Sequence, residues 1–122
     1  MSAEEIVRSF CQAVPRRDPK ELAGFFSADA VYHNIPIDPV TGPEQIEKML
    51  GQFLGPASEA EFEVLTLAVD GNRVLTERVD RFTIGGKRIE LPVMGAFEVG
   101  SDGKITAWRD YFDMAQFTGQ MG

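Results

Sequence analysis

Two short motifs in the second half of the chain combine acidic residues with groups that could control their protonation. One is an Arg-x-Asp motif at Arg78 and Asp80, and the other is a Trp-x-Asp motif at Trp108 and Asp110. One carboxylate can accept a proton from water while a second, protonated carboxyl donates one, provided that their environments separate their pKa values. An arginine between them permits both roles, because it neutralises one carboxylate while desolvation and repulsion favour a proton on the other. These residue types therefore indicate acid/base chemistry on an uncharged substrate.

The neighbours of Asp110 predict that its side chain points into the protein. Alternate side chains of a strand share a face, so Asp110 lies on the same face as the large aromatic residues Trp108 and Phe112. If those rings face the interior, Asp110 faces it too, and a half-buried carboxylate needs a hydrogen-bonding or cationic partner. We expect Arg78 to be that partner.

Three more polar residues can be sorted by the same alternation. Phe82 turns Asp80 inward, and Tyr32 shares a face with Asn34 whereas His33 takes the opposite face. A phenol hydroxyl and an amide can hold a water molecule in a fixed orientation. Because the chain shows neither a Ser/His/Asp nor a Cys/His arrangement, we expect water to be the nucleophile.

The first half of the chain predicts the helices that must cover these strands. Ser2 and Glu5 have the spacing of a capping box, which starts a helix that ends at Pro15. Turn residues and apolar spacing predict the other elements in this order: a short helix over 18–26, a strand over 30–35, a proline-rich loop over 36–43 and a helix over 43–54.

The second half predicts a series of strands. Runs rich in β-branched and aromatic residues are separated by short turns, and they cover residues 62–69, 73–84, 87–99 and 105–112. Strands joined by such short turns must be antiparallel, so the first-half helices must cover one face of the resulting sheet. We expect an α+β architecture with one domain over residues 1–122.

The composition indicates which classes of binding partner are unfavourable and where in the cell the protein resides. The chain has 19 acidic and 12 basic residues and a formal charge of −7, which opposes binding to nucleic acid or to an anionic membrane. No apolar run is long enough for a membrane helix, and the acidic N-terminus is unlike a signal peptide, so we expect a cytoplasmic protein. A single cysteine and a single histidine, Cys11 and His33, cannot supply a zinc site, and we expect no metal.

The motifs together resemble the limonene-1,2-epoxide hydrolase family, within the larger nuclear-transport-factor-2-like or SnoaL-like superfamily. The resemblance is carried by Tyr-His-Asn at 32–34, Arg-Val-Asp at 78–80 and the run GKITAWRDYFD at 103–113. It extends over nearly the whole chain. It implies a cone-shaped, cystatin-like fold, in which N-terminal helices cover a curved, mixed and mostly antiparallel sheet. It also implies a homodimer.

The resemblance further implies a role for each motif residue. Asp110 is the base that activates water, and Tyr32 and Asn34 complete the hydrogen bonds of that water. Asp80 is the acid that protonates the epoxide oxygen, and Arg78 bridges the two aspartates. The reaction is a one-step hydrolysis of a hydrophobic epoxide to a vicinal diol, without a cofactor or a covalent intermediate. The implied substrate-binding residues are Phe82, Leu91, Val93, Trp108 and Phe112.

Three other interpretations remain open from the residues. The same fold could carry a ketosteroid-isomerase-like or polyketide-cyclase-like enzyme, although two carboxylates held by one arginine suit that chemistry less well. It could also be a non-catalytic module that binds lipophilic molecules. Finally, Arg78, Asp80 and Asp110 could be a buried ion-pair triad that only orders the core.

Overall fold

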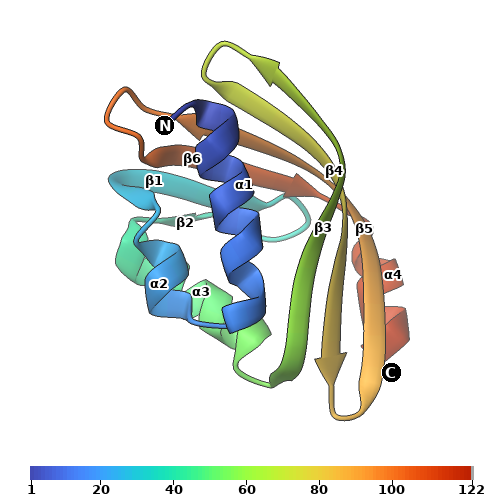
Figure 1. The fold of residues 1–122 in the computed structure, drawn as a ribbon. Coiled ribbons are helices and arrows are strands. Elements are labelled where there is room, and N and C mark those ends of the chain that lie inside the picture. Colours follow the sequence, from blue (N-terminus) through green and yellow to red (C-terminus); the bar gives the residue numbers. More distant parts are fainter. Residues whose placement is uncertain (122) are drawn as a thin grey trace.

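The computed structural model describes residues 1–121, which form a strongly curved sheet around a set of helices (Figure 1). In chain order the elements are α1 (Ala3–Ala13), a 3₁₀ turn (Val14–Arg16), α2 (Pro19–Ala23), β1 (Phe26–Asn34), β2 (Val40–Thr41), α3 (Pro43–Leu54), β3 (Ala57–Asp70), β4 (Arg73–Ile84), β5 (Lys87–Val99), β6 (Ile105–Tyr111) and α4 (Met114–Met121). None of the helices in this described part is long and apolar enough to cross a membrane.

The six strands form one mixed sheet in the order β2-β1-β6-β5-β4-β3. Strands β3 to β6 are a continuous antiparallel series, as the short turns predict. Strand β1 pairs in parallel with β6, so a strand from the helical half of the chain lies beside the last strand. This arrangement confirms the expected α+β architecture with a mixed, mostly antiparallel sheet.

Helix α1 starts where the sequence predicts. The Ser2 hydroxyl accepts a hydrogen bond from the Glu5 amide at 3.1 Å, and the Glu5 carboxylate accepts one from the Ser2 amide at 2.9 Å. The helix ends at Ala13, because Pro15 lies in a tighter 3₁₀ turn that Arg17 closes with a positive φ of 54°. The chain can then reverse and begin α2.

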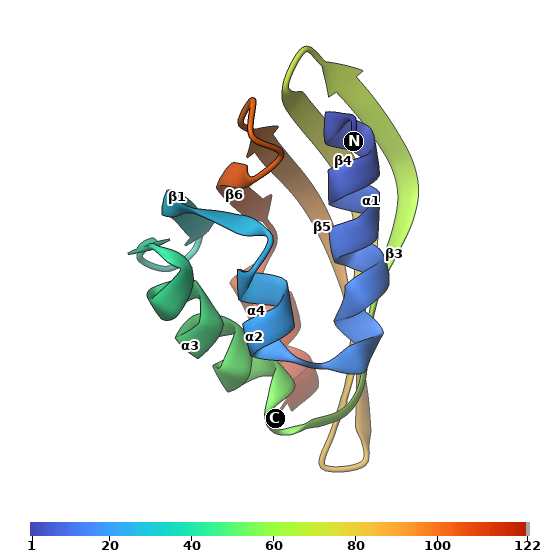
Figure 2. The same ribbon diagram turned by 60° about the vertical axis from the view of Figure 1, so that its left-hand side comes forward.

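The core lies between α1 and the concave face of the sheet. Figures 1 and 2 show α1 running along the sheet, while α2 and α3 lie on the side of β1. Phe10 of α1 is fully buried and meets Phe26, Phe97 and Trp108 with its ring edge-on or steeply inclined, at centroid distances between 5.0 and 6.0 Å. Such aromatic contacts tie the helix to β1, β5 and β6.

Three boundaries differ clearly from the sequence expectation because tertiary pairing overrides local propensity. The second helix stops at Ala23, before Gly24, and the strand begins at Phe26 instead of residue 30. Phe26 is buried against the aromatic core and pairs with Ile105, which favours an extended backbone. Strand β3 likewise begins at Ala57 instead of residue 62, because its partner β4 continues as far as Ile84.

Two elements were not expected from the sequence. Residues 40 and 41 lie in the region predicted as loop, but they form the short strand β2 against β1. Helix α4 follows the last strand and begins after Asp113, whose carboxylate accepts a hydrogen bond from the Ala115 amide at 2.9 Å. Its apolar residues do not form one clear stripe, so only the capping residue signals it.

Candidate active site

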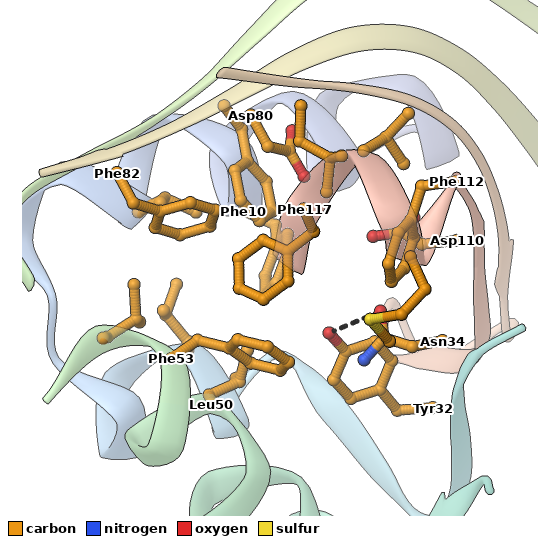
Figure 3. Close-up of a pocket in the computed structure, with 17 residues that line it drawn as sticks. Phe10, Tyr32, Asn34, Leu50, Phe53, Asp80, Phe82, Asp110, Phe112 and Phe117 are labelled. Atoms are coloured by element: carbon orange, nitrogen blue, oxygen red, sulfur yellow. Dashed lines mark hydrogen bonds between the residues drawn. The ribbon is translucent and has the colours of Figure 1, made fainter. Parts of the chain in front are cut away.

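The concave face of the sheet and the helices surround a cavity (Figure 3). Four polar residues lie on its wall: Tyr32, Asn34, Asp80 and Asp110. The remaining lining residues are apolar, namely Phe10, Val14, Leu22, Leu50, Phe53, Leu54, Phe62, Phe82, Leu91, Val93, Phe112, Met114 and Phe117. The polar groups therefore face an otherwise hydrophobic space, as binding sites for small apolar ligands commonly do.

Arg78 bridges the two aspartates, as the alternation along the strands predicts. Its Nε and Nη2 atoms donate to the two carboxylate oxygens of Asp80 at 3.0 and 2.9 Å. Its Nη1 and Nη2 atoms donate to the two oxygens of Asp110 at 3.1 and 2.8 Å. The remaining N–H group, on Nη1, donates to the Thr76 hydroxyl at 3.2 Å. All five donors of the guanidinium are thus used in a site where its side chain has no exposed surface.

The strand arrangement explains why these groups meet. Arg78 and Asp80 are alternate residues of β4, and Asp110 lies on β6, so strand β5 separates the arginine from one of its partners. The side chain of Arg78 crosses the inner face of β5 to reach Asp110. The ring of Phe62 covers the guanidinium at 4.7 Å, which adds a cation–π contact on one side.

Trp108 fixes the position of Asp110 by a hydrogen bond and is not among the residues that line the cavity. Its indole N–H donates to Asp110 Oδ1 at 2.7 Å. The indole is fully buried and stacked between Tyr32, at 4.0 Å, and Phe97, at 5.4 Å. Because this stack occupies both of its faces, Trp108 does not line the cavity, and the expectation that it does is wrong.

Tyr32 and Asn34 lie beside Asp110 because β1 and β6 run in parallel. Asn34 is the direct neighbour of Asp110 in the strand register, and Tyr32 is the neighbour of Trp108. The Tyr32 hydroxyl donates to Asn34 Oδ1 at 3.2 Å, a bond visible in Figure 3. This bond leaves the amide N–H groups of Asn34 and the oxygen lone pairs of Tyr32 available to a molecule in the cavity.

Burial and the single positive charge set the protonation of the network. Burial raises the pKa of Asp80 to about 6, against the lowering effect of the Arg78 guanidinium, while the neighbouring Asp110 adds to the increase. Burial would lower the pKa of Arg78, but the two carboxylates raise it well above its ordinary value, so Arg78 stays charged. Burial also raises the pKa of Tyr32, which keeps this phenol neutral. One arginine and two carboxylates therefore favour retention of one proton, on Asp80.

Four of the five residues expected to bind substrate lie on the cavity wall: Phe82, Leu91, Val93 and Phe112. Helices α3 and α4 also contribute side chains to the cavity wall, which the strand motifs did not predict. Helix α3 supplies Leu50, Phe53 and Leu54, and their helical spacing could have identified a face shared by the core and the cavity. Met114 and Phe117 come from α4, which was not expected at all.

Comparison with known proteins places this geometry in one family. Residues 1–121 match the limonene-1,2-epoxide hydrolase catalytic domain. Epoxide hydrolase EphG of Mycobacterium tuberculosis is 35% identical over 108 residues, which cover 88% of this chain and 71% of that protein. The structure of an LEH-like epoxide hydrolase of M. tuberculosis superposes with a TM-score of 0.84 at 33% identity, covering 97% of this chain and 87% of the other.

Similarity of fold, without high sequence identity, also links this chain to more distant proteins. A protein with a ketosteroid isomerase-like fold from Catenulispora acidiphila has a TM-score of 0.85 at 23% identity, over 95% of this chain and 91% of that chain. This more distant structure shares the curved sheet and its helices. The match over residues 1–121, the 35% identity and the arginine that joins two aspartates lead to the same assignment. The chain belongs to the limonene-1,2-epoxide hydrolase family.

Proposed function

We propose that this protein is a cofactor-independent epoxide hydrolase that adds water in one step to a hydrophobic epoxide and releases a vicinal diol. The observation that carries the proposal is the pair of carboxylates on the cavity wall, joined by one fully buried arginine. This arrangement gives one carboxyl that keeps a proton and one that accepts a proton, which are the two groups that epoxide opening by water requires.

In this proposal Asp110 is the base. Arg78 and Trp108 together donate three hydrogen bonds to its carboxylate, which fix its position and reduce its own nucleophilicity. A water molecule beside it gives one hydrogen to Asp110 and the other to the Tyr32 oxygen, and accepts an N–H bond from Asn34. The fourth tetrahedral position of the water, a lone pair, then points at the substrate.

Asp80 is the acid. Its raised pKa keeps a proton available, and it lies on the same cavity wall as Asp110. As the water oxygen forms a bond to one epoxide carbon, the C–O bond of the ring breaks and the departing oxygen takes the proton of Asp80. Asp110 takes a proton from the water. Transfer of one proton from Asp110 to Asp80 then restores the resting state of both carboxyls. The reaction therefore needs no cofactor.

The cavity wall supports a hydrophobic substrate. Its only polar groups, among the described residues that line it, are the four already assigned to water, acid and base. An additional polar substituent on the substrate would lose its hydration without finding a partner, which costs binding free energy. We therefore propose an epoxide whose remaining surface is hydrocarbon.

A small epoxide panel tests the proposal. We expect diol from limonene oxide or cyclohexene oxide with the wild-type protein, and no diol above background with Asp110→Asn. Conjugation of an enone without diol formation would instead establish an isomerase on this fold. Binding of the epoxides without turnover of any of them would establish a lipophile-binding module and contradict the hydrolase.

We also propose that the protein forms a homodimer in the cytoplasm through the outer face of the sheet. Leu75, Met94 and Tyr111 lie on that face with 43%, 53% and 49% of their surface exposed, and Met94 is paired with Tyr111 across β5 and β6. Exposed large apolar residues grouped on one face favour burial against a second copy. Light scattering should give twice the monomer mass for wild type and for Val69→Glu, and the monomer mass for Met94→Glu. A monomeric wild type would contradict the proposal.

A further inference from the structure

One polar side chain of the network lies outside the cavity and outside the roles assigned above. Thr76 is fully buried on β4, on the same face as Arg78. Its hydroxyl accepts a hydrogen bond from Arg78 Nη1 at 3.2 Å and donates one to the Gly95 carbonyl oxygen at 3.2 Å. The hydroxyl hydrogen is therefore committed to the backbone, so the Oγ1 lone pair faces the arginine.

Gly95 lies at the centre of the same row. In the strand register it is the partner of Thr76 on β4 and of Asp110 on β6. Strands β4 and β6 are two strand spacings apart, about 10 Å, so Arg78 must pass over β5 to reach Asp110. A Cβ atom at position 95 would overlap Arg78 Nη1 and would lie 2.6 Å from Asp110 Oδ1 and 3.0 Å from Thr76 Oγ1. The absence of a side chain at Gly95 creates the space that the ion pair occupies.

The Thr76 hydroxyl determines how the N–H groups of Arg78 are shared between Asp80 and Asp110. Because Thr76 takes one N–H of Nη1, only one N–H of that nitrogen remains for Asp110. Nη2 gives one N–H to each aspartate, and Nε gives its own to Asp80. Each carboxylate thus receives two hydrogen bonds from Arg78, and the guanidinium is held between them.

We infer that Thr76 is a positioning residue, which acts with the gap at Gly95 to hold Arg78 between the acid Asp80 and the base Asp110. This inference rests on the proposed hydrolase function. Without the hydroxyl, one N–H of a charged and fully buried group has no acceptor, and the guanidinium tilts to recover one. That tilt would misalign both carboxylates while the apolar cavity that binds the substrate remains unchanged.

The test compares Thr76→Val with Thr76→Ser. We expect Thr76→Val to lower kcat about 10- to 100-fold, the range seen for small misplacements of catalytic groups, with little change in KM. Thr76→Ser keeps the hydroxyl and should stay within about 3-fold of wild type, because the serine Oγ can make the same two bonds. Since a loosened Arg78 lowers the pKa of Asp80 less, the alkaline limb of kcat/KM should move to higher pH in Thr76→Val only.

Thr106→Val is the matched control. The Thr106 hydroxyl donates to the Glu98 carbonyl at 3.2 Å, so this variant removes the same kind of bond between neighbouring strands of the same sheet. Equal losses of kcat in Thr76→Val and Thr106→Val would assign Thr76 a merely structural role and overturn the inference. Wild-type kcat and pH profile in Thr76→Val would overturn it as well.

A titration separates this inference from the hydrolase proposal. If wild type hydrolyses no epoxide of the panel, the hydrolase fails, and carbon-13 NMR of labelled aspartate carboxyls then tests the positioning role alone. A midpoint for Asp80 that rises in Thr76→Val and returns in Thr76→Ser supports it, and an unchanged midpoint overturns it. Should Thr76→Val not fold, Gly95→Ala provides the second variant. A folded Gly95→Ala protein with wild-type kcat and a wild-type titration midpoint for Asp80 would contradict the role inferred for the space at Gly95.

Discussion

Strand β4 carries two arginine–carboxylate networks, one on each face of the sheet. On the inner face, Arg78 binds two aspartates with donor–acceptor distances between 2.8 and 3.1 Å. On the outer face, three positions along the strand, Arg81 binds three glutamates at 2.7 to 3.1 Å. These glutamates are Glu61, Glu63 and Glu90. Bond lengths alone do not distinguish the two networks.

The difference lies in exposure to water. The side chain of Arg78 is 0% exposed, and those of its two partners are 6% and 4% exposed. The side chain of Arg81 is 22% exposed, and its three partners are between 45% and 54% exposed. Water screens the outer charges, so that network contributes little to the stability of the fold. Burial instead raises the pKa of Asp80 to about 6, which favours a protonated carboxyl in the inner network and suits the acid and base roles proposed for its two aspartates.

The largest difference is expected in catalysis when one carboxylate of each network becomes an amide. Asp80→Asn removes the proposed proton donor, so diol formation should fall by a factor on the order of 100 to 10,000. Glu63→Gln makes the corresponding change on the outer face and should leave the rate unchanged. Initial rates with the best epoxide of the panel measure both. Equal rates in the two variants would remove the distinction on which the mechanism depends.

Replacing each arginine should separate the networks in stability. Arg78→Met leaves two buried carboxylates without their cation, and such losses typically cost about 3–5 kcal/mol of unfolding free energy. Arg81→Met breaks pairs that water screens, so its loss of unfolding free energy should be much smaller. Urea unfolding at pH 7 measures the two variants against wild type. A smaller loss for Arg78→Met than for Arg81→Met would show that burial does not govern the inner network.

Stability should also depend on pH through Asp80. Its pKa rises from 3.8 in the unfolded chain to about 6 in the folded protein, so its stabilising effect is complete below pH 3.8 and is lost as pH rises through 6. The loss corresponds to about 3 kcal/mol. Because asparagine does not titrate, the difference in unfolding free energy between wild type and Asp80→Asn should shrink by this amount from pH 4 to pH 8. A constant difference would contradict the raised pKa.

The smallest expected effect is the pH dependence of activity. The proposed mechanism requires Asp80 in its protonated form, and the pKa of Asp80 is about 6, so kcat/KM should fall as pH rises above about 6. Glu63→Gln should show the same alkaline limb as wild type, because the outer network has no part in proton transfer. A value of kcat/KM that stays level from pH 5 to pH 8 would exclude Asp80 as the acid.

Much of the inner network could be predicted from the sequence because alternation along a strand is a short-range property. The pairs Arg78 and Asp80, Trp108 and Asp110, and Tyr32 and Asn34 each lie two residues apart, so one apolar neighbour is enough to assign their face. The structure places Arg78 between Asp80 and Asp110, as this argument predicts.

The features of the fold and the site that the sequence did not predict depend on contacts between segments that are distant in the chain. The family resemblance implied that Trp108 binds substrate, but Tyr32 and Phe97 cover its ring from either side. The start of β1 at Phe26 depends on pairing with the last strand, which local propensity does not report. The space at Gly95 becomes visible only when three strands are side by side.

A single-turnover reaction in oxygen-18 water, with enzyme in excess over epoxide, tests the central claim that Asp110 activates water instead of attacking the substrate. If water attacks directly, the diol of the first turnover carries one oxygen-18 atom. If Asp110 forms an ester, hydrolysis of that ester transfers a carboxylate oxygen, so the first diol is unlabelled and the label remains on the enzyme. Labelled diol is the result predicted here, and unlabelled diol from the first turnover would contradict it.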